Sequence, residues 1–315
     1  MYYSFSHIEL TLPPDTRAAH NSVRNTWHNK HTMTASDDAP IIPALPRRST
    51  NESWQESIIA SRAGRGRLWW EISLVLGLSL GASALYSIVD FIADLTAGTS
   101  LSQQSAALNP SQNSREWLDF TYQFLGLSLD LVAVGLALYL LWEPGRSAFR
   151  RIGLDFRKPW RDLGAGCALV AIIGIPGLAL FIVGRLIGIT VNVQPAPLSG
   201  YWWTVPLLVF SALRAGLQEE VIVVGYLFTR LRQLGWNRWS IILVAAVLRG
   251  SYHLYQGVGP FIGNAAMGVV FGWCYTRWGR VLPLVIAHTI IDIVSFVGYP
   301  AAVALWPHVF IAPHA

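Results

Sequence analysis

The stretch LQEEVIVVGYLFTR, residues 217–230, places two adjacent carboxylates inside a run that is otherwise almost wholly apolar. A charged side chain at membrane depth costs a few kcal/mol on insertion scales, and it is rare there without a function. Arg230 marks the end of the run, and helical rise would place Glu219 roughly 16 Å inside it. That is too deep for easy snorkelling to water, so we expect the carboxylates to serve a polar site within a bundle of helices.

The composition indicates a multi-pass membrane protein. Of the 315 residues, 53% are hydrophobic and 13% are charged, whereas a soluble domain carries roughly twice that charged fraction. We predict an all-α transmembrane helix bundle of about 7–8 spans, because this is the number of apolar segments of near-spanning length. These segments are 69–95, 117–142, 163–190, 203–230, 239–256, 261–277 and 281–299, with a short eighth at 300–312.

The connections between these segments alternate in charge. RAGRGR, EPGRSAFRRIGLDFRKPWRD, RLRQLGWNR and RWGR are basic, whereas the intervening connections carry one arginine or none. The positive-inside rule then predicts a cytoplasmic N-terminus and a multi-pass protein of the cell membrane. The net charge of +5 lies in these clusters, so we expect the lipid bilayer, and no nucleic acid, as a partner. The excess of arginine over lysine hints at a bacterial source.

The chain divides into three regions by polar content. Residues 1–66 are polar and without period, which predicts a disordered cytoplasmic tail. Residues 67–161 hold two spans and a basic loop. Residues 162–315 form a core region, and its last four spans collect nearly all of the membrane-depth ionisable residues.

The polar residues of these last spans are spaced to meet one another. Arg249 and His253 are four residues apart, as are His288 and Asp292, so each pair would share a helix face. A buried guanidinium needs an anion. Asp292 can bond the imidazole of His288 and fix its tautomer, or make a separate polar contact. We expect these residues to share one functional site with the two glutamates.

The order of these residues resembles the CPBP family of intramembrane proteases, also called the CAAX-protease and bacteriocin-processing or Abi family. The family pattern is a double Glu with an Arg four residues after the second, then Phe-x-x-x-His, then His-x-x-x-Asn/Asp. Glu219–Glu220, His253, and His288 with Asp292 match it in order, over about residues 203–296. The resemblance implies an endopeptidase that hydrolyses a peptide bond of a membrane-associated protein or peptide.

Two positions depart from the family pattern. Val224 stands where the pattern has Arg, and Arg249 stands where it has Phe. An unpaired Arg and an unpaired Glu in one bundle would each cost several kcal/mol. We therefore expect Arg249 to pair with Glu220 from the neighbouring helix, as accessory residues of the site.

The resemblance implies roles for the matched residues. Glu219 would act as general base, and His253 would hold and polarise the water. His288 would donate a hydrogen bond to the oxyanion, with Asp292 acting through His288 or a water. We prefer this mechanism without a cofactor. A metallopeptidase with Zn²⁺ on Glu219, His253 and His288 stays open as an alternative.

A non-enzymatic role is the competing hypothesis. A catalytically inactive CPBP-like scaffold or immunity protein could keep the polar residues for binding alone. A transporter would show an internal repeat of broken helices, and the sequence contains no such self-similarity. Insensitivity to the replacement of Glu219 would distinguish the inactive protein from the protease.

Overall fold

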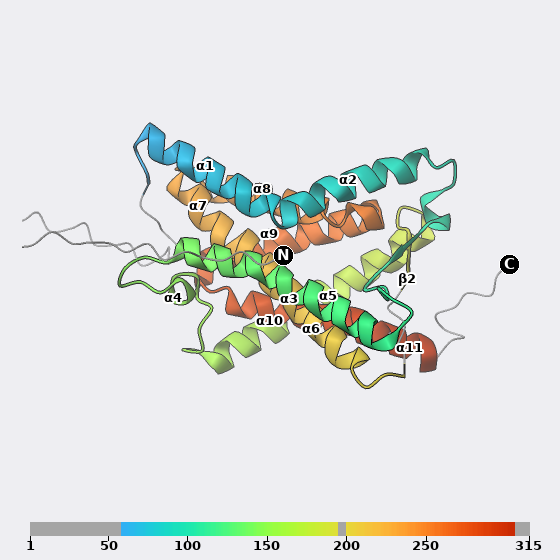
Figure 1. Cartoon of the computed structure of the whole chain (residues 1–315). Helices are drawn as coiled ribbons and strands as arrows, with labels where there is room; N and C mark the ends of the chain where they lie inside the picture. Colours follow the sequence, from blue (N-terminus) through green and yellow to red (C-terminus); the bar gives the residue numbers. More distant parts are fainter. Residues whose placement is uncertain (1–57, 195–199, 306–315) are drawn as a thin grey trace, which may run out of the picture. The chain divides into compact units, whose positions relative to one another are not determined.

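A computed structural model of the chain describes residues 58–194 and 200–305. The fold is predominantly helical (Figure 1). Its α-helices are α1 Arg62–Gly77, α2 Leu80–Thr96, α3 Glu116–Leu141, α4 Ala148–Ile152, α5 Pro159–Leu186, α6 Thr204–Glu219, α7 Leu227–Gln233, α8 Arg238–Ser251, α9 Val258–Trp278, α10 Leu282–Ile293 and α11 Tyr299–Leu305.

Short elements connect or extend these helices. The π-helices η2 (Glu220–Tyr226) and η4 (Val294–Gly298) continue α6 and α10. The remaining short elements are the 3₁₀ turns η1 Leu101–Gln103 and η3 Leu254–Gln256, and the strands β1 Ser105–Ala107 and β2 Asn192–Gln194. The two strands pair in parallel, with Ser105 opposite Asn192.

The protein is a multi-pass membrane protein by the length and apolarity of its helices. Four helices among the described residues are long and apolar enough to span a membrane: Glu116–Leu141, Pro159–Gly184, Val258–Trp278 and Leu282–Ala301. The expected first span, 69–95, consists of α1 and α2, which are bent by 58° at the break between them. If this bent pair counts as one span, the total is five. The predicted count of 7–8 spans is not confirmed by the described residues.

The predicted tail and the predicted eighth segment lie largely outside the described residues. Residues 1–57 and 306–315 are not described. Helix α1 begins at Arg62, so the last residues of the expected tail are helical. The Ser61 side chain caps this helix by accepting a hydrogen bond from the backbone N–H of Gly64, which stabilises a start earlier than hydrophobicity predicts.

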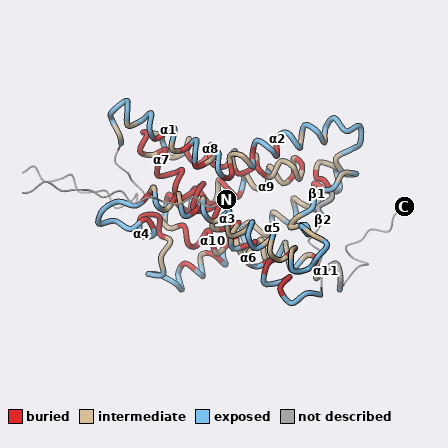
Figure 2. The backbone as a smooth tube through the Cα atoms, in the orientation of Figure 1, coloured by how far each residue is buried: buried red, intermediate tan, exposed pale blue. Residues whose placement is uncertain are grey.

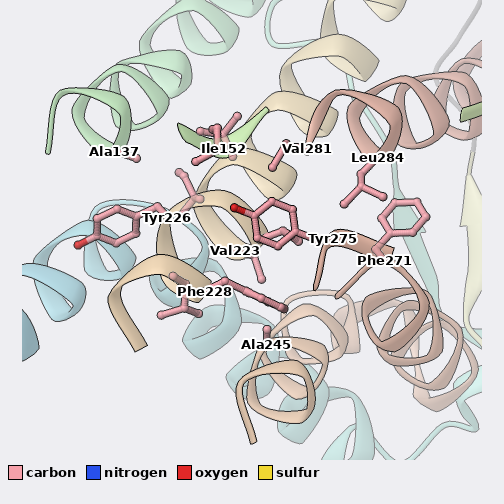
Figure 3. Packing of buried hydrophobic residues seen from close by; sticks show 14 of the residues in the cluster. Ala137, Ile152, Val223, Tyr226, Phe228, Ala245, Phe271, Tyr275, Val281 and Leu284 are labelled. Carbon is pink, nitrogen blue, oxygen red and sulfur yellow. The ribbon is translucent and has the colours of Figure 1, made fainter. Parts of the chain in front are cut away.

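The continuous rod α6–η2–α7 lies at the centre of the hydrophobic core. Every residue of η2 is buried, because its Val, Ile and Tyr side chains face neighbouring helices on all sides. Figure 3 shows Val223, Tyr226 and Phe228 of this rod packed among residues of other helices. Figure 2 shows buried residues gathered around α7, whereas α2 is largely exposed. Exposed apolar side chains of α2, α3 and α5 form surfaces suited to lipid.

Close packing of α8 on α9 depends on two glycines. A Cβ on Gly268 would lie 2.8 Å from the Cα of Ala246, and one on Gly272 would lie 3.3 Å from the Ile242 side chain of α8 and 2.9 Å from the Phe228 ring of α7. The absence of a side chain at these two positions permits the close helix contact. The contact brings the Arg249 end of α8 against α9.

Ion pairs fix the end of the bundle that carries the basic connections. The Arg280 guanidinium lies 2.6 Å from Asp162 Oδ2 and 3.0 Å from Asp155 Oδ1. Burial raises the pKa of Asp155, but hydrogen bonds from the Arg157 backbone N–H and from Arg280 outweigh it and leave that pKa below its ordinary value. Helix α10 packs against α5 and α6, so the Arg280 pairs hold its start in place.

Candidate active site

The two glutamates lie where an α-helix becomes a π-helix. Glu219 is the last residue of α6 and Glu220 is the first of η2. Single π-helical turns within α-helices occur often at functional sites. The altered winding helps two adjacent carboxylates to reach partners on the same neighbouring helices. Both side chains are buried, and Glu220 is fully so.

The other site residues come from α8, α10 and the turn after α8. Arg249 lies in the last turn of α8, and His288 and Asp292 lie on α10. His253 lies beyond the end of α8, which stops at Ser251. The expected helix over 239–256 is therefore wrong in its second part, and Arg249 and His253 do not share a regular helix face. The backbone turns at His253, which precedes η3.

Glu220 joins Arg249 to His288. Its Oε1 accepts hydrogen bonds from the Arg249 guanidinium and from Nδ1 of His288, the latter at 2.7 Å. The predicted pairing of Arg249 with Glu220 is thereby confirmed. Arg249 also lies against the Phe271 ring, with Cζ 5.4 Å from the ring centroid. Arg249 of α8 thus supplies a cation to Glu220, while position 224 is a buried valine.

Glu219 uses its two carboxylate oxygens differently. Oε2 accepts hydrogen bonds from the Tyr252 hydroxyl at 2.6 Å and from Arg249 Nη2 at 3.2 Å. Oε1 lies 3.9 Å from Nε2 of His253 and 3.9 Å from Nε2 of His288. Because these distances exceed a direct hydrogen bond, Oε1 is not hydrogen-bonded directly to either imidazole.

His288 is fixed from both sides. Glu220 contacts Nδ1 at 2.7 Å, and Asp292 Oδ2 lies 3.5 Å from Nε2. Glu220 bonds Nδ1, whereas Asp292 lies beside Nε2, the nitrogen that faces Glu219. The role of Asp292 in fixing the tautomer stays a prediction.

His253 has the least constrained side chain of the site. Neither ring nitrogen has a hydrogen-bond partner among the described residues. Its side chain is 22% exposed, compared with 9% for Glu219 and 3% for His288. Both nitrogens are themselves buried, and a buried polar atom without an internal partner is suited to bind a water or a substrate group that enters the site.

Residue spacing in the sequence did not point to two further polar residues of this region, Tyr252 and Arg214. Tyr252 is buried and bonds Glu219, and its signal was its position three residues after Arg249, next to His253. Arg214 on α6 bonds Gln218 at 3.0 Å and lies 3.7 Å from Asp130 on α3. The Asp130–Arg214 contact joins helices far apart in sequence, and residue spacing within either helix carries no signal of it.

The suggested ligands of the zinc alternative are Glu219, His253 and His288. Among residues 58–194 and 200–305, no three His, Cys, Asp or Glu side chains are arranged to hold a metal ion. The suggested ligands are separated by 3.9 Å from Glu219 to each imidazole. Zinc ligands approach the ion to about 2.0–2.3 Å, so two donors on one ion lie roughly 3–4 Å apart, and the zinc alternative stays a prediction.

The segment that supplies these residues matches a known family of proteases. Residues 201–294 are similar to type II CAAX prenyl endopeptidase Rce1-like proteins. The resemblance to the CPBP family is confirmed. No curated protein and no solved structure shows significant similarity to the chain. The Rce1-like segment contains all six candidate site residues, and it supports a CAAX-type intramembrane protease.

Proposed function

We propose that this protein is an intramembrane endopeptidase that hydrolyses a peptide bond of a membrane-associated protein or peptide. One observation carries the proposal: Oε1 of Glu219 lies 3.9 Å from Nε2 of both His253 and His288, while its other oxygen is held by Tyr252 and Arg249. A water beside Oε1 of Glu219 would contact one carboxylate oxygen that can accept its proton and the Nε2 atoms of His253 and His288.

Glu219 is the proposed general base. Oε1 takes a proton from the water, and the water oxygen forms a bond to the scissile carbonyl carbon. The carbonyl π electrons move to its oxygen, which becomes an oxyanion. When the carbon–nitrogen bond breaks, Glu219 returns the proton to the departing amine nitrogen. The reaction is balanced without a further reactant.

The two histidines stabilise the oxyanion and position the water. His253 donates a hydrogen bond from Nε2 because neither of its nitrogens is engaged with a described residue. His288 is held by Glu220 and flanked by Asp292, so its orientation is set before substrate arrives. The positive charge of Arg249 offsets the negative charges of Glu219 and Glu220. This mechanism uses no metal.

The membrane arrangement is part of the same proposal. We place the basic connections on the cytoplasmic side, with a cytoplasmic N-terminus, 7–8 crossings and a bacterial cell membrane as the location. Short and bent helices such as α8 and the α1–α2 pair would account for crossings beyond the four long helices. The partners are then the bilayer and a membrane-associated substrate.

Mapping of new peptide ends tests the activity directly. Membranes containing the unaltered chain, the Glu219→Gln variant or the Glu143→Gln control would be analysed by mass spectrometry, with a prenylated CAAX peptide added as a reporter. Glu143 is about half exposed and pairs with Arg151. We expect cleavage products with the unaltered chain and the control but not with Glu219→Gln. Identical peptide ends in all three would overturn the proposal.

An inactive scaffold or immunity protein is the second candidate. The departures at Val224 and Arg249 favour it, because Arg249 contacts both carboxylates and could hold them in a purely structural role. In that case a cellular phenotype of the protein would be unaffected by Glu219→Gln, whereas a protease phenotype would be lost.

A further inference from the structure

A cleft of about 450 Å³ lined only by apolar atoms opens between α5, α8 and α9. None of its lining side chains belongs to the candidate active site. Five of them are Ala165 and Ala168 from α5, Trp239 from α8, and Val269 and Trp273 from α9. A cleft without polar groups in a membrane protein is suited to a hydrocarbon chain.

The cleft lies at the end of the bundle that carries the basic connections. Helices α5 and α8 begin there, and α9 ends there at Trp278. Its lining extends along α9 from Trp278 to Val269, which is roughly 13 Å at helical rise. One leaflet of the hydrocarbon core is about 15 Å deep. The cleft therefore has the length of an acyl chain segment entering from the interface.

Two arginines stand beside the tryptophans of the cleft. Arg238 Cζ lies 5.5 Å from the centroid of the Trp239 ring, and Arg277 Cζ lies 5.5 Å from that of Trp273. Neither guanidinium has an ion-pair partner within the part of the chain that the structure describes. Stacking on a ring leaves the N–H edges of a guanidinium free, and these edges match the oxygens of a phosphate.

We propose that this cleft binds an anionic phospholipid. One acyl chain lies between α5 and α9 along the apolar lining, and the phosphate lies between Arg238 and Arg277. Charge complementarity selects the anionic class, because two cations flank the cleft and no carboxylate lines it. The proposal does not rest on the peptidase activity, since the site shares no residue with it.

Photolabelling tests the site in the full chain. The protein would be reconstituted in phosphatidylcholine vesicles that contain a small fraction of phosphatidylglycerol with a diazirine in its acyl chain. A parallel sample would contain phosphatidylcholine with the same diazirine. Mass spectrometry would then locate labelled peptides of α5 and α9. We expect roughly fivefold more labelling near Ala168 and Trp273 by the anionic lipid, because each interfacial arginine adds a modest attraction.

Two variants separate this site from lipid that surrounds any membrane protein. Arg238→Gln with Arg277→Gln removes the cations and should reduce the lipid preference to about one. The control is Arg65→Gln with Arg67→Gln, which removes the same charge from exposed positions of α1. Ala168→Trp should fill the cleft and reduce labelling by both lipids there. Equal labelling by the two lipids in the unaltered protein, or a preference that survives loss of Arg238 and Arg277, would overturn the proposal.

Discussion

The Tyr252 hydroxyl donates a 2.6 Å hydrogen bond to Oε2 of Glu219, so Tyr252 does not occupy Oε1, the oxygen that we propose takes the proton. Arg249 Nη2 contacts the same oxygen at 3.2 Å. Oε1 consequently faces the imidazoles of His253 and His288. A general base needs a fixed direction as well as a proton affinity, so in the proposed mechanism Tyr252 helps to orient Glu219.

Replacing Tyr252 by Phe should slow cleavage by about ten- to a hundredfold, since a hydrogen bond to a charged group contributes about 1.5–3 kcal/mol. We expect the loss in kcat with little change in KM, because the hydroxyl contacts the base and not the substrate. Kinetics on the reporter peptide would show this. A matched control is Tyr86→Phe, at an exposed position of α2. Unchanged kcat in Tyr252→Phe would contradict the positioning role.

Arg249→Met should lower the stability of the protein by about 3–5 kcal/mol, because it leaves buried carboxylates without their cation. Adding Glu220→Gln to this variant should recover part of the loss, since one of the unpaired charges is then removed. Denaturant unfolding in detergent measures both effects. If the double variant is no more stable than Arg249→Met alone, the ion pair is not the source of the destabilisation.

The two histidines should differ in their effect on stability. His253→Gln is expected to reduce cleavage about 10²–10⁴-fold with almost no change in thermal midpoint, because its ring has no described hydrogen-bond partner. His288→Gln should reduce both cleavage and stability, since it breaks the bond to Glu220. Thermal unfolding next to the cleavage assay distinguishes them. Equal destabilisation by both variants would argue against an unengaged His253.

Chelation separates the metal-free mechanism from the zinc alternative. We expect the purified protein to contain no stoichiometric zinc and to keep its activity after treatment with a strong chelator and dialysis. Elemental analysis measures the zinc content, and the cleavage assay measures the activity that remains after chelation. Activity that disappears on chelation and returns with Zn²⁺ would instead establish a metallopeptidase and reassign Glu219 as a ligand.

Acidification should weaken the Asp155–Arg280 contact. The native pKa of Asp155 lies below its ordinary value of 3.8, so its contribution to stability is present above that value. The contribution is lost as the pH falls through the native pKa. The thermal midpoint in detergent should therefore decline below about pH 4, close to the unperturbed Asp pKa. Asp155→Asn should be less stable at neutral pH and show a smaller decline, whereas Asp90→Asn, at an exposed position, should behave as the unaltered chain.

Much of the site could be predicted because its chemistry is carried by rare residues in an apolar background. Charged groups at membrane depth must find partners, so Glu220 and Arg249 were predictable as a pair. The membrane class follows from composition for the same reason. The helical character of the chain is also dictated by the need to satisfy backbone polar groups within each segment.

Other features depend on tertiary packing that spacing does not encode. Helix α8 ends at Ser251, directly after Gly250, but an isolated Gly within an apolar run does not by itself fix where a helix ends. The bend between α1 and α2 occurs in an apolar run around Ser79, whose hydroxyl bonds the carbonyl of Val75. The contact of Arg214 with Asp130 joins α6 to α3. Of these features, the contact between Arg214 and Asp130 is the one that the packing of neighbouring helices decides.

The π-helix at Glu220 has a consequence for how the chain can change in length. A π-helical turn holds one residue more than the α-helical turn it replaces. Removal of a single residue from Val221–Tyr226 could therefore restore an ordinary α-helix without breaking the rod. The apolar core would lose one side chain, but the carboxylates before the deletion would rotate relative to everything after it. Such a chain would keep its membrane helices and lose the shared position of Glu219 and Glu220, so chain length, and not residue type alone, specifies the site.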